Sequence, residues 1–96
     1  MSRTRRLTFR LHALQRMYQR RISDADVRKV VESGEVIEDY PSDEPYPSQL
    51  LLGWVRGRSL HVVVAHNAAN DEVIVITVYE PAVTLWESDL RRRRKS

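Results

Sequence analysis

Apolar residues recur with a helical period over residues 7–20. On a helical wheel one side of this stretch is apolar, and its members are Leu11, Leu14 and Tyr18, with Ala13 and Met17 beside them. An apolar side of this kind is typical of a helix that packs on a protein core. The pattern therefore predicts a first helix whose Leu11–Leu14–Tyr18 stripe is buried.

A second helix is predicted shortly after the first. Ser23 is a preferred residue for capping a helix N-terminus, and Asp24 and Asp26 follow in the first turn, where the helix dipole stabilises anions. The next apolar positions continue to about Ser33 and are Val27, Val30 and Val31. Because only a few residues join the two helices, we expect them to form an antiparallel helical hairpin.

After Gly34 the pattern changes from helical to extended. Four strands are predicted in succession: Val36–Tyr40, Gln49–Val55, Ser59–His66 and Glu72–Glu80. A last stretch, Thr84–Arg94, is predicted as a short C-terminal helix that holds Leu85, Trp86 and Leu90 against the sheet. The order of elements predicts an α+β fold, in which the helical hairpin packs on a four-stranded antiparallel sheet.

Charge is strongly segregated along the 96 residues, a length that suits one domain, 1–96. Residues 1–31 carry nine cations and two acids, residues 32–55 carry six acids and no cation, and residues 91–96 carry five cations. Fourteen of the 16 cationic residues are arginine, whose planar guanidinium suits phosphate. We expect a flexible basic arm at residues 1–6, a flexible basic tail at 91–96 and an affinity for RNA. The alternative is that these charges only keep the surface solvated.

Several classes of protein chemistry lack support in the sequence. There is no cysteine, so disulfides and thiolate sites are excluded. The three histidines match no zinc-binding spacing and the three glycines are isolated, so we expect no metal, no nucleotide-binding loop and no cofactor. No apolar run is long enough to cross a membrane, and the basic start lacks the apolar core of a signal peptide. The expectation is a cytoplasmic protein with no membrane partner.

The residues that remain for chemistry are histidine, arginine and tyrosine. On the first helix, His12, Arg16 and Arg20 recur every four residues and form a row opposite the apolar stripe. A row of cations of this kind can hold RNA phosphate or stabilise the charge of a phosphoryl transition state. The alternative is a polar helix face that pairs with the acidic segment 35–44.

A second candidate group lies on the predicted strands. The strand parities of His61 and Tyr79 allow them to share the sheet face away from the helices, with Arg58 at its rim. A partly exposed histidine that titrates near neutrality can act as general acid or base, and a tyrosine hydroxyl can position a phosphate. The alternative is a histidine at the edge of the core and a tyrosine whose hydroxyl has an internal partner.

Several motifs, taken together, resemble a small bacterial family of unknown function, domain of unknown function 4258. They are His12-Ala13-Leu14-Gln15-Arg16-Met17 with Arg20-Arg21-Ile22-Ser23, then residues 34–41, 46–48, 57–65 and 76–81. The resemblance covers about residues 8–86. The family is grouped with the RelE/ParE-like toxins, which implies the same helical hairpin on an antiparallel sheet. Many of those toxins have a strand before the first helix, and none is predicted in this chain.

The resemblance implies two alternative activities. RelE-like members cleave mRNA, usually on the ribosome and without a metal, whereas ParE-like members bind and poison DNA gyrase. An antitoxin protein neutralises both kinds. The leading hypothesis is therefore a toxin–antitoxin-type, metal-independent endoribonuclease. Its candidate residues are His61, His12 and Tyr79 for catalysis, and Arg16, Arg20, Arg58, Arg91, Arg92 and Arg93 for RNA phosphate. The alternative is a non-catalytic protein-binding module or an inactive relative.

Overall fold

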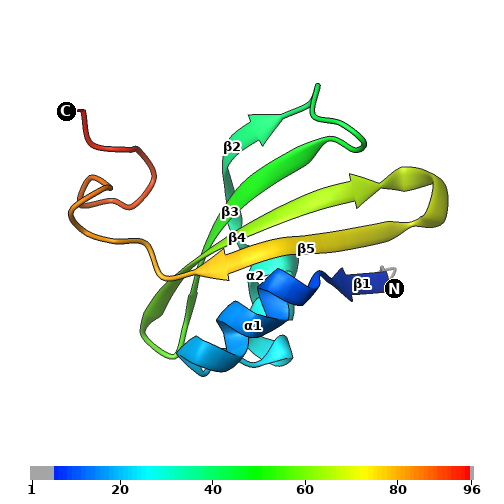
Figure 1. The fold of residues 1–96 in the computed structure, drawn as a ribbon. Coiled ribbons are helices and arrows are strands. Elements are labelled where there is room, and N and C mark those ends of the chain that lie inside the picture. Colours follow the sequence, from blue (N-terminus) through cyan, green and yellow to red (C-terminus); the bar gives the residue numbers. More distant parts are fainter. Residues whose placement is uncertain (1–5, 96) are drawn as a thin grey trace.

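A computed structural model describes residues 6–95, which form two helices and a five-stranded sheet (Figure 1). In chain order the elements are β1 (Arg6–Phe9), α1 (Leu11–Arg20), α2 (Asp24–Ser33), β2 (Glu35–Tyr40), β3 (Ser48–Val55), β4 (Arg58–Asn67), a 3-10 turn (Ala68–Asn70) and β5 (Glu72–Tyr79). The α+β class is as predicted, and each of the four predicted strands agrees with β2 to β5 to within one residue at either end. Within the described residues, no helix is long and apolar enough to cross a membrane.

The sheet has one strand more than predicted, and its order is β1-β5-β4-β3-β2. The additional strand, β1, lies parallel to β5, while β2 to β5 pair antiparallel. The predictions of Arg6 in a basic arm and of residues 7–9 in the first helix are therefore wrong. Leu7 and Phe9 pack against the main core, and β1 pairs with the outer edge of β5, which would otherwise be an open apolar strand. The rest of the predicted arm, residues 1–5, lies outside the described residues.

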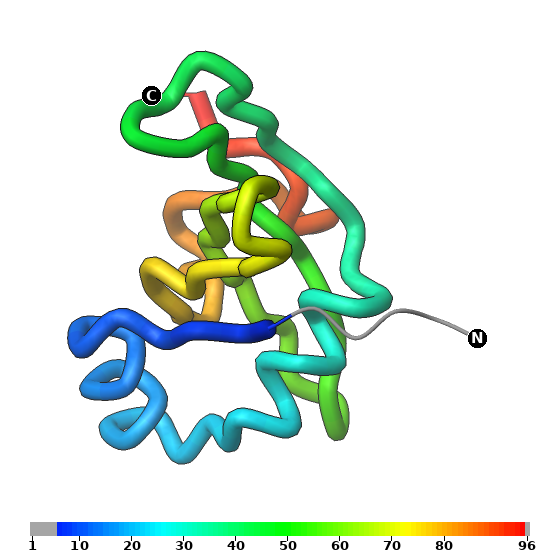
Figure 2. Tube along the Cα trace, turned by 90° about the vertical axis from the view of Figure 1, so that its right-hand side faces the viewer, coloured from blue at the N-terminus to red at the C-terminus, as the bar shows by residue number. Residues whose placement is uncertain are grey.

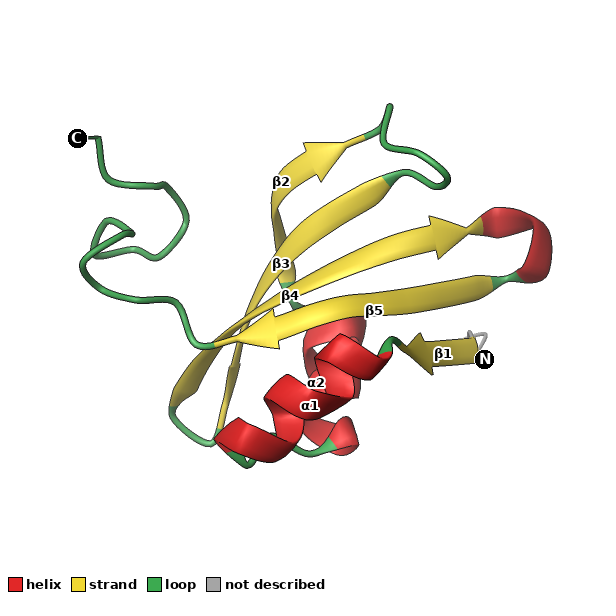
Figure 3. Cartoon of the chain, in the orientation of Figure 1, coloured by secondary structure: helices red, strands yellow, loops and turns green. Residues whose placement is uncertain are grey.

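Both helices cover the same face of the sheet, α1 against β5 and α2 against β3 (Figure 3). The main core lies between them and the sheet, and its buried members are Ala13, Met17, Ile22, Val27, Val30, Leu51, Val55, Leu60, Val62, Val64, Val73, Val75 and Val78. Helix α2 approaches the sheet closely at Gly53 of β3, where a Cβ atom would lie 2.7 Å from a methyl carbon of Val30. Gly53 therefore lets α2 sit directly on the sheet.

The start of α2 follows the predicted capping. Ser23 Oγ accepts a hydrogen bond from the Asp26 backbone N–H, and the Asp26 carboxylate accepts one from the Ser23 N–H, both at 3.1 Å. The Asp26 carboxylate is also 2.8 Å from Arg56 in the β3–β4 turn. This carboxylate thus fastens the helix N-terminus to the sheet, which secures the position of α2.

The predicted burial of the α1 stripe is wrong. The buried residues of α1 are Ala13 and Met17, while Leu11, Leu14 and Tyr18 are 70%, 46% and 89% exposed. The apolar arc of this helix is broad, so its sequence leaves open which part of the arc faces the sheet. The rotation is fixed by β1, because the Arg10 N–H just before α1 donates to Val75 O of β5 at 3.0 Å.

The other face of the sheet is covered by residues 82–95, which run across it without a helix (Figure 2). Trp86 and Leu90 are buried there as predicted, on Leu50 and Leu52 of β3, whereas Leu85 is exposed. The predicted helix over Thr84–Arg94 is wrong. One bond of helical spacing, from the Trp86 N–H to Ala82 O, is not continued. The Glu87 N–H donates to Arg92 O and the Arg94 N–H donates to Leu85 O, so the segment closes a loop.

Candidate functional site

His61 and Tyr79 are neighbours on the sheet face that residues 82–95 cover. The two residues are direct partners in the β4–β5 register, and the His61 Nδ1 atom is 3.3 Å from the Tyr79 hydroxyl. The two rings meet edge to face, with their centroids 5.2 Å apart. The sequence-based prediction that His61 and Tyr79 share one face of the sheet is confirmed.

His61 is, however, fully buried, with an exposed fraction of 0%, so the expectation of a partly exposed histidine is wrong. The Trp86 ring stands over it at a centroid distance of 4.4 Å, and His61 Nε2 is 2.9 Å from Leu90 O. Leu90 O can only accept, so Nε2 carries the proton and Nδ1 is free to accept from the Tyr79 hydroxyl. Both ring nitrogens thus have internal partners in the neutral form of the ring.

Burial determines the electrostatics of this pair. Burial lowers the pKa of His61 from its ordinary value, and the Leu90 carbonyl offsets only part of that effect. Burial also raises the pKa of Tyr79. His61 is therefore a neutral histidine that is shielded from substrate as long as residues 82–95 stay in place, and Tyr79 is a half-buried neutral phenol.

The arginines of the C-terminal segment bind the acidic strand β2. Arg91 Nε lies 3.0 and 2.9 Å from the two carboxylate oxygens of Glu35, and Arg93 Nε lies 3.8 Å from the Glu38 carboxylate. The Arg93 guanidinium also covers the Trp86 ring, 4.7 Å from its centroid. The predicted flexible tail thus folds back at these two residues, and the acidic segment pairs with them and not with the α1 row.

Arg58 lies on the opposite face from His61, because residues three apart in a strand point to opposite sides. Its guanidinium donates to Arg20 O at 2.8 Å and to Arg21 O at 3.1 Å, at the C-terminal end of α1, and pairs with Glu80 at 2.9 Å. The hydrogen bond to Glu80 is the main cause that raises the pKa of Arg58. The expectation of Arg58 at the rim of a His61 site is therefore wrong, and its contacts are those of a helix cap.

The remaining candidates lie on the solvent side of α1. His12, Arg16 and Arg20 are exposed along one flank of the helix, opposite the exposed Leu11–Leu14–Tyr18 stripe. Helix α1 contains no acidic residue, and within residues 6–95 neither Arg16 nor Arg20 forms an ion pair. Sequence reasoning found the cationic row but missed the exposed stripe, because a helical apolar pattern alone indicates a core contact.

The predicted catalytic residues therefore do not form one site in this structure. His61 and Tyr79 lie under the C-terminal segment, Arg58 caps α1 on the other face of the sheet, and His12 is on the outer side of α1. In the described part of the chain, histidine, aspartate and glutamate side chains do not gather in groups of three that could hold a metal ion. Helix α1 combines exposed cations with exposed apolar side chains.

A family model matches residues 9–80, which is most of the chain. The chain belongs to the family described as Domain of unknown function (DUF4258). The match runs from the end of β1 to the residue after β5, so it contains both helices and β2 to β5 and stops before residues 82–95. Comparison with curated proteins gave no match, and comparison with solved structures gave none either.

Proposed function

We propose that this DUF4258 protein is a toxin-type module of the RelE/ParE-like kind that acts by binding a protein through the outer face of α1. The observation that carries the proposal is the double exposure on this helix: an apolar stripe on one flank and an arginine row on the other. Two helices followed by antiparallel strands, with a strand before the first helix, support the RelE/ParE-like grouping.

The composition of this face suits a protein interface. Tyrosine and arginine are the residue types that contribute most often to binding energy at interfaces, and Tyr18 is 89% exposed beside Leu11 and Leu14. Leucine side chains do not bind phosphate, so a surface that binds only nucleic acid phosphate does not account for the exposed leucines. Because the arginine row occupies the other flank, and Arg10 and Arg21 extend the cationic charge past both ends of the helix, the partner surface we infer is apolar where it meets the stripe and acidic where it meets the row and the helix ends.

An endoribonuclease activity is the second candidate, and the His61–Tyr79 pair favours it. A proton acceptor and a hydroxyl lie side by side on one sheet face, as general acid–base cleavage of RNA requires. In that reaction a base takes the proton of the ribose 2′-hydroxyl while an acid protonates the leaving 5′-oxygen. This activity requires residues 82–95 to leave the face first, so we rank it below protein binding.

Regulated expression in bacteria tests the proposed function. We expect wild-type protein to arrest growth while mRNA, examined by primer extension, stays intact. Leu14→Glu with Tyr18→Glu should abolish the arrest, because a lost interface anchor of about 2 kcal/mol lowers partner affinity about 30-fold and the new carboxylates repel an acidic partner.

The matched control is Val83→Glu with Leu85→Glu, which adds the same two charges at exposed apolar positions of the C-terminal segment, on the other face of the sheet from α1. The control should keep growth arrest, and both double variants should melt within a few degrees of wild type. Cleaved mRNA in wild-type cells would favour the endoribonuclease instead. Normal growth of cells that express the wild type, or full arrest by the Leu14→Glu, Tyr18→Glu protein, would overturn the proposal.

A further inference from the structure

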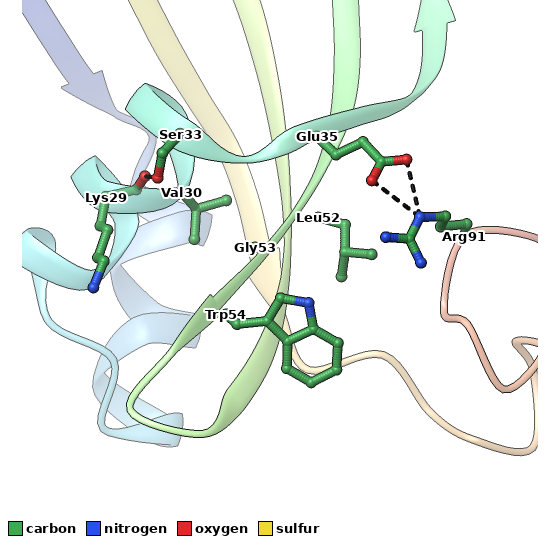
Figure 4. Close-up of a pocket in the computed structure, with 8 residues that line it drawn as sticks. All are labelled: Lys29, Val30, Ser33, Glu35, Leu52, Gly53, Trp54 and Arg91. Carbon is green, nitrogen blue, oxygen red and sulfur yellow. Dashed lines mark hydrogen bonds and ion pairs between the residues drawn. The ribbon is translucent and has the colours of Figure 1, made fainter.

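A hollow lies at the end of the sheet where β2 parts from β3. The two strands pair only as far as Glu35 and Leu52, so residues 53–55 of β3 have no strand on that side. The hollow has a volume of about 300 Å³, at the lower end of the range for small-ligand sites. Figure 4 shows the side chains around it, which are those of Lys29, Val30, Ser33, Glu35, Leu52, Trp54 and Arg91, beside the backbone of Gly53.

Trp54 is the aromatic side chain of this hollow, and it is 57% exposed. Along β3, Leu50 and Leu52 point to the same face as Trp54, and both are buried under the C-terminal segment. The segment covers these two residues and leaves the indole open. Trp54 therefore contributes little to the core, and its flat ring offers a surface on which another planar ring can stack.

Two cations flank this indole, Lys29 on α2 and Arg91 on the C-terminal segment (Figure 4). Lys29 has no ion pair within residues 6–95. Arg91 uses Nε for Glu35 and Nη1 for Asp89 O, which leaves Nη2 without a described partner. Because Glu35 is already engaged by Arg91, the hollow carries a net positive charge and favours an anionic ligand on either side of Trp54.

We infer that this hollow binds a nucleoside phosphate, with the base stacked on Trp54 and its phosphates on Lys29 and Arg91. A stacking ring between two cations matches a base with a phosphate on each side, which is the arrangement of a nucleotide within single-stranded RNA. A nucleoside bisphosphate presents the same chemistry in free form. The site lies apart from the α1 face, so it does not depend on the proposed protein partner.

Calorimetric titration of the full chain with adenosine 3′,5′-bisphosphate tests the inference. Adenosine supplies the base alone and inorganic phosphate supplies the charge alone, so each should bind at least about tenfold more weakly than the bisphosphate. Trp54→Ala should weaken bisphosphate binding by about tenfold or more, because stacking on an aromatic side chain contributes about 1–3 kcal/mol per base. Trp54→Phe should retain part of the affinity.

A matched pair of α2 variants tests the charge. Lys29→Gln should weaken binding several-fold, whereas Arg28→Gln should not, because Arg28 is outside the hollow and pairs with Asp24 at 3.6 Å. Trp54 and Lys29 are surface residues, so the variants should melt like wild type. Titration with hexa-adenylate separates the two sources of the ligand. If hexa-adenylate binds more tightly than the bisphosphate and loses the same affinity in Trp54→Ala, the site is assigned to an RNA chain. If the two probes bind equally, the site is assigned to a free nucleotide.

Three results would overturn the inference. The first is no heat of binding with millimolar bisphosphate. The second is equal affinity of wild type and Trp54→Ala, both folded. The third is inorganic phosphate that binds as tightly as the bisphosphate, since that would leave no role for stacking. If an acidic tyrosine-containing peptide bound at Trp54 while the bisphosphate did not, the hollow would belong to a protein partner instead.

Discussion

Trp86→Ala is expected to lower the free energy of unfolding by about 3–5 kcal/mol, the usual cost of truncating a buried aromatic side chain. Trp86 is only 2% exposed, stands over the His61 ring and is itself covered by the Arg93 guanidinium. Its loss leaves a cavity on the sheet and removes the main anchor of residues 82–95. A domain of this size has a total stability of about 5–15 kcal/mol, so the variant should fold but unfold at much lower urea concentration.

Urea unfolding followed by far-UV circular dichroism measures this effect without relying on tryptophan fluorescence. The matched control is Leu85→Ala, which truncates the neighbouring residue at 60% exposure and should change the stability by less than about 0.5 kcal/mol. Trp86→Phe should fall between the two. An unfolding midpoint of Trp86→Ala equal to that of Leu85→Ala would show that Trp86 does not anchor the C-terminal segment to the sheet.

The elements that could be predicted from the sequence are those with a local signal, either an apolar pattern that continues along the element or a cap whose partners are close in sequence. β4 and β5 are apolar on both faces over most of their length, and the α2 cap has both of its partners within four residues, so local sequence is enough to predict these elements. β1 has only four residues and is stabilised by parallel pairing with a strand more than sixty residues away. A strand of this kind has no local signature that distinguishes it from the start of the helix that follows.

The candidate site depends on two features, and the sequence pattern contains only the first of them. The face shared by His61 and Tyr79 follows from strand parity, which made that part predictable. The burial of His61 follows from residues 82–95, which contact the sheet through only two buried side chains, Trp86 and Leu90. Two anchors in an irregular segment form no period, so neither the cover over His61 nor the loop between the anchors could be predicted.

The contacts that bury the His61 ring also hold residues 82–95 over the His61–Tyr79 pair. The stability of these contacts therefore decides whether the pair can reach RNA, as the second candidate function requires. Truncation to alanine would leave the Leu90 carbonyl without a donor, which costs about 1–3 kcal/mol in addition to the lost packing against Trp86 and Tyr79. Protonation of the ring acts on the same contacts. As an imidazolium, Nδ1 would donate to the Tyr79 hydroxyl and no longer accept from it, and a charge would be buried on an apolar sheet face.

The protein is therefore expected to lose stability as the pH falls below about 6.5. Burial lowers the pKa of His61 from 6.5, with Glu38 on β2 acting weakly against this and Arg93 weakly in its favour. Above pH 6.5 neither the folded nor the unfolded chain binds this proton, so the group contributes no pH dependence. As the pH falls through 6.5 the unfolded chain takes up the proton and the folded chain does not, so the free energy of unfolding drops by at most about 1.4 kcal/mol per pH unit until the lowered pKa is reached.

Urea unfolding at pH 7.5, 6.5 and 5.5 measures this slope, and His61→Gln serves as the control. Glutamine can still donate to the Leu90 carbonyl but does not titrate, so the variant should lose the histidine part of the slope while the other acids and bases titrate as before. The difference in free energy of unfolding between wild type and His61→Gln should be constant from pH 7.5 to 6.5. At pH 5.5 the wild type should have lost more stability than the variant. Parallel pH profiles down to pH 5.5 would mean that the folded protein takes up the proton as readily as the unfolded chain does. In that case His61 would be open to solvent, and the reason for ranking RNA cleavage second would be gone.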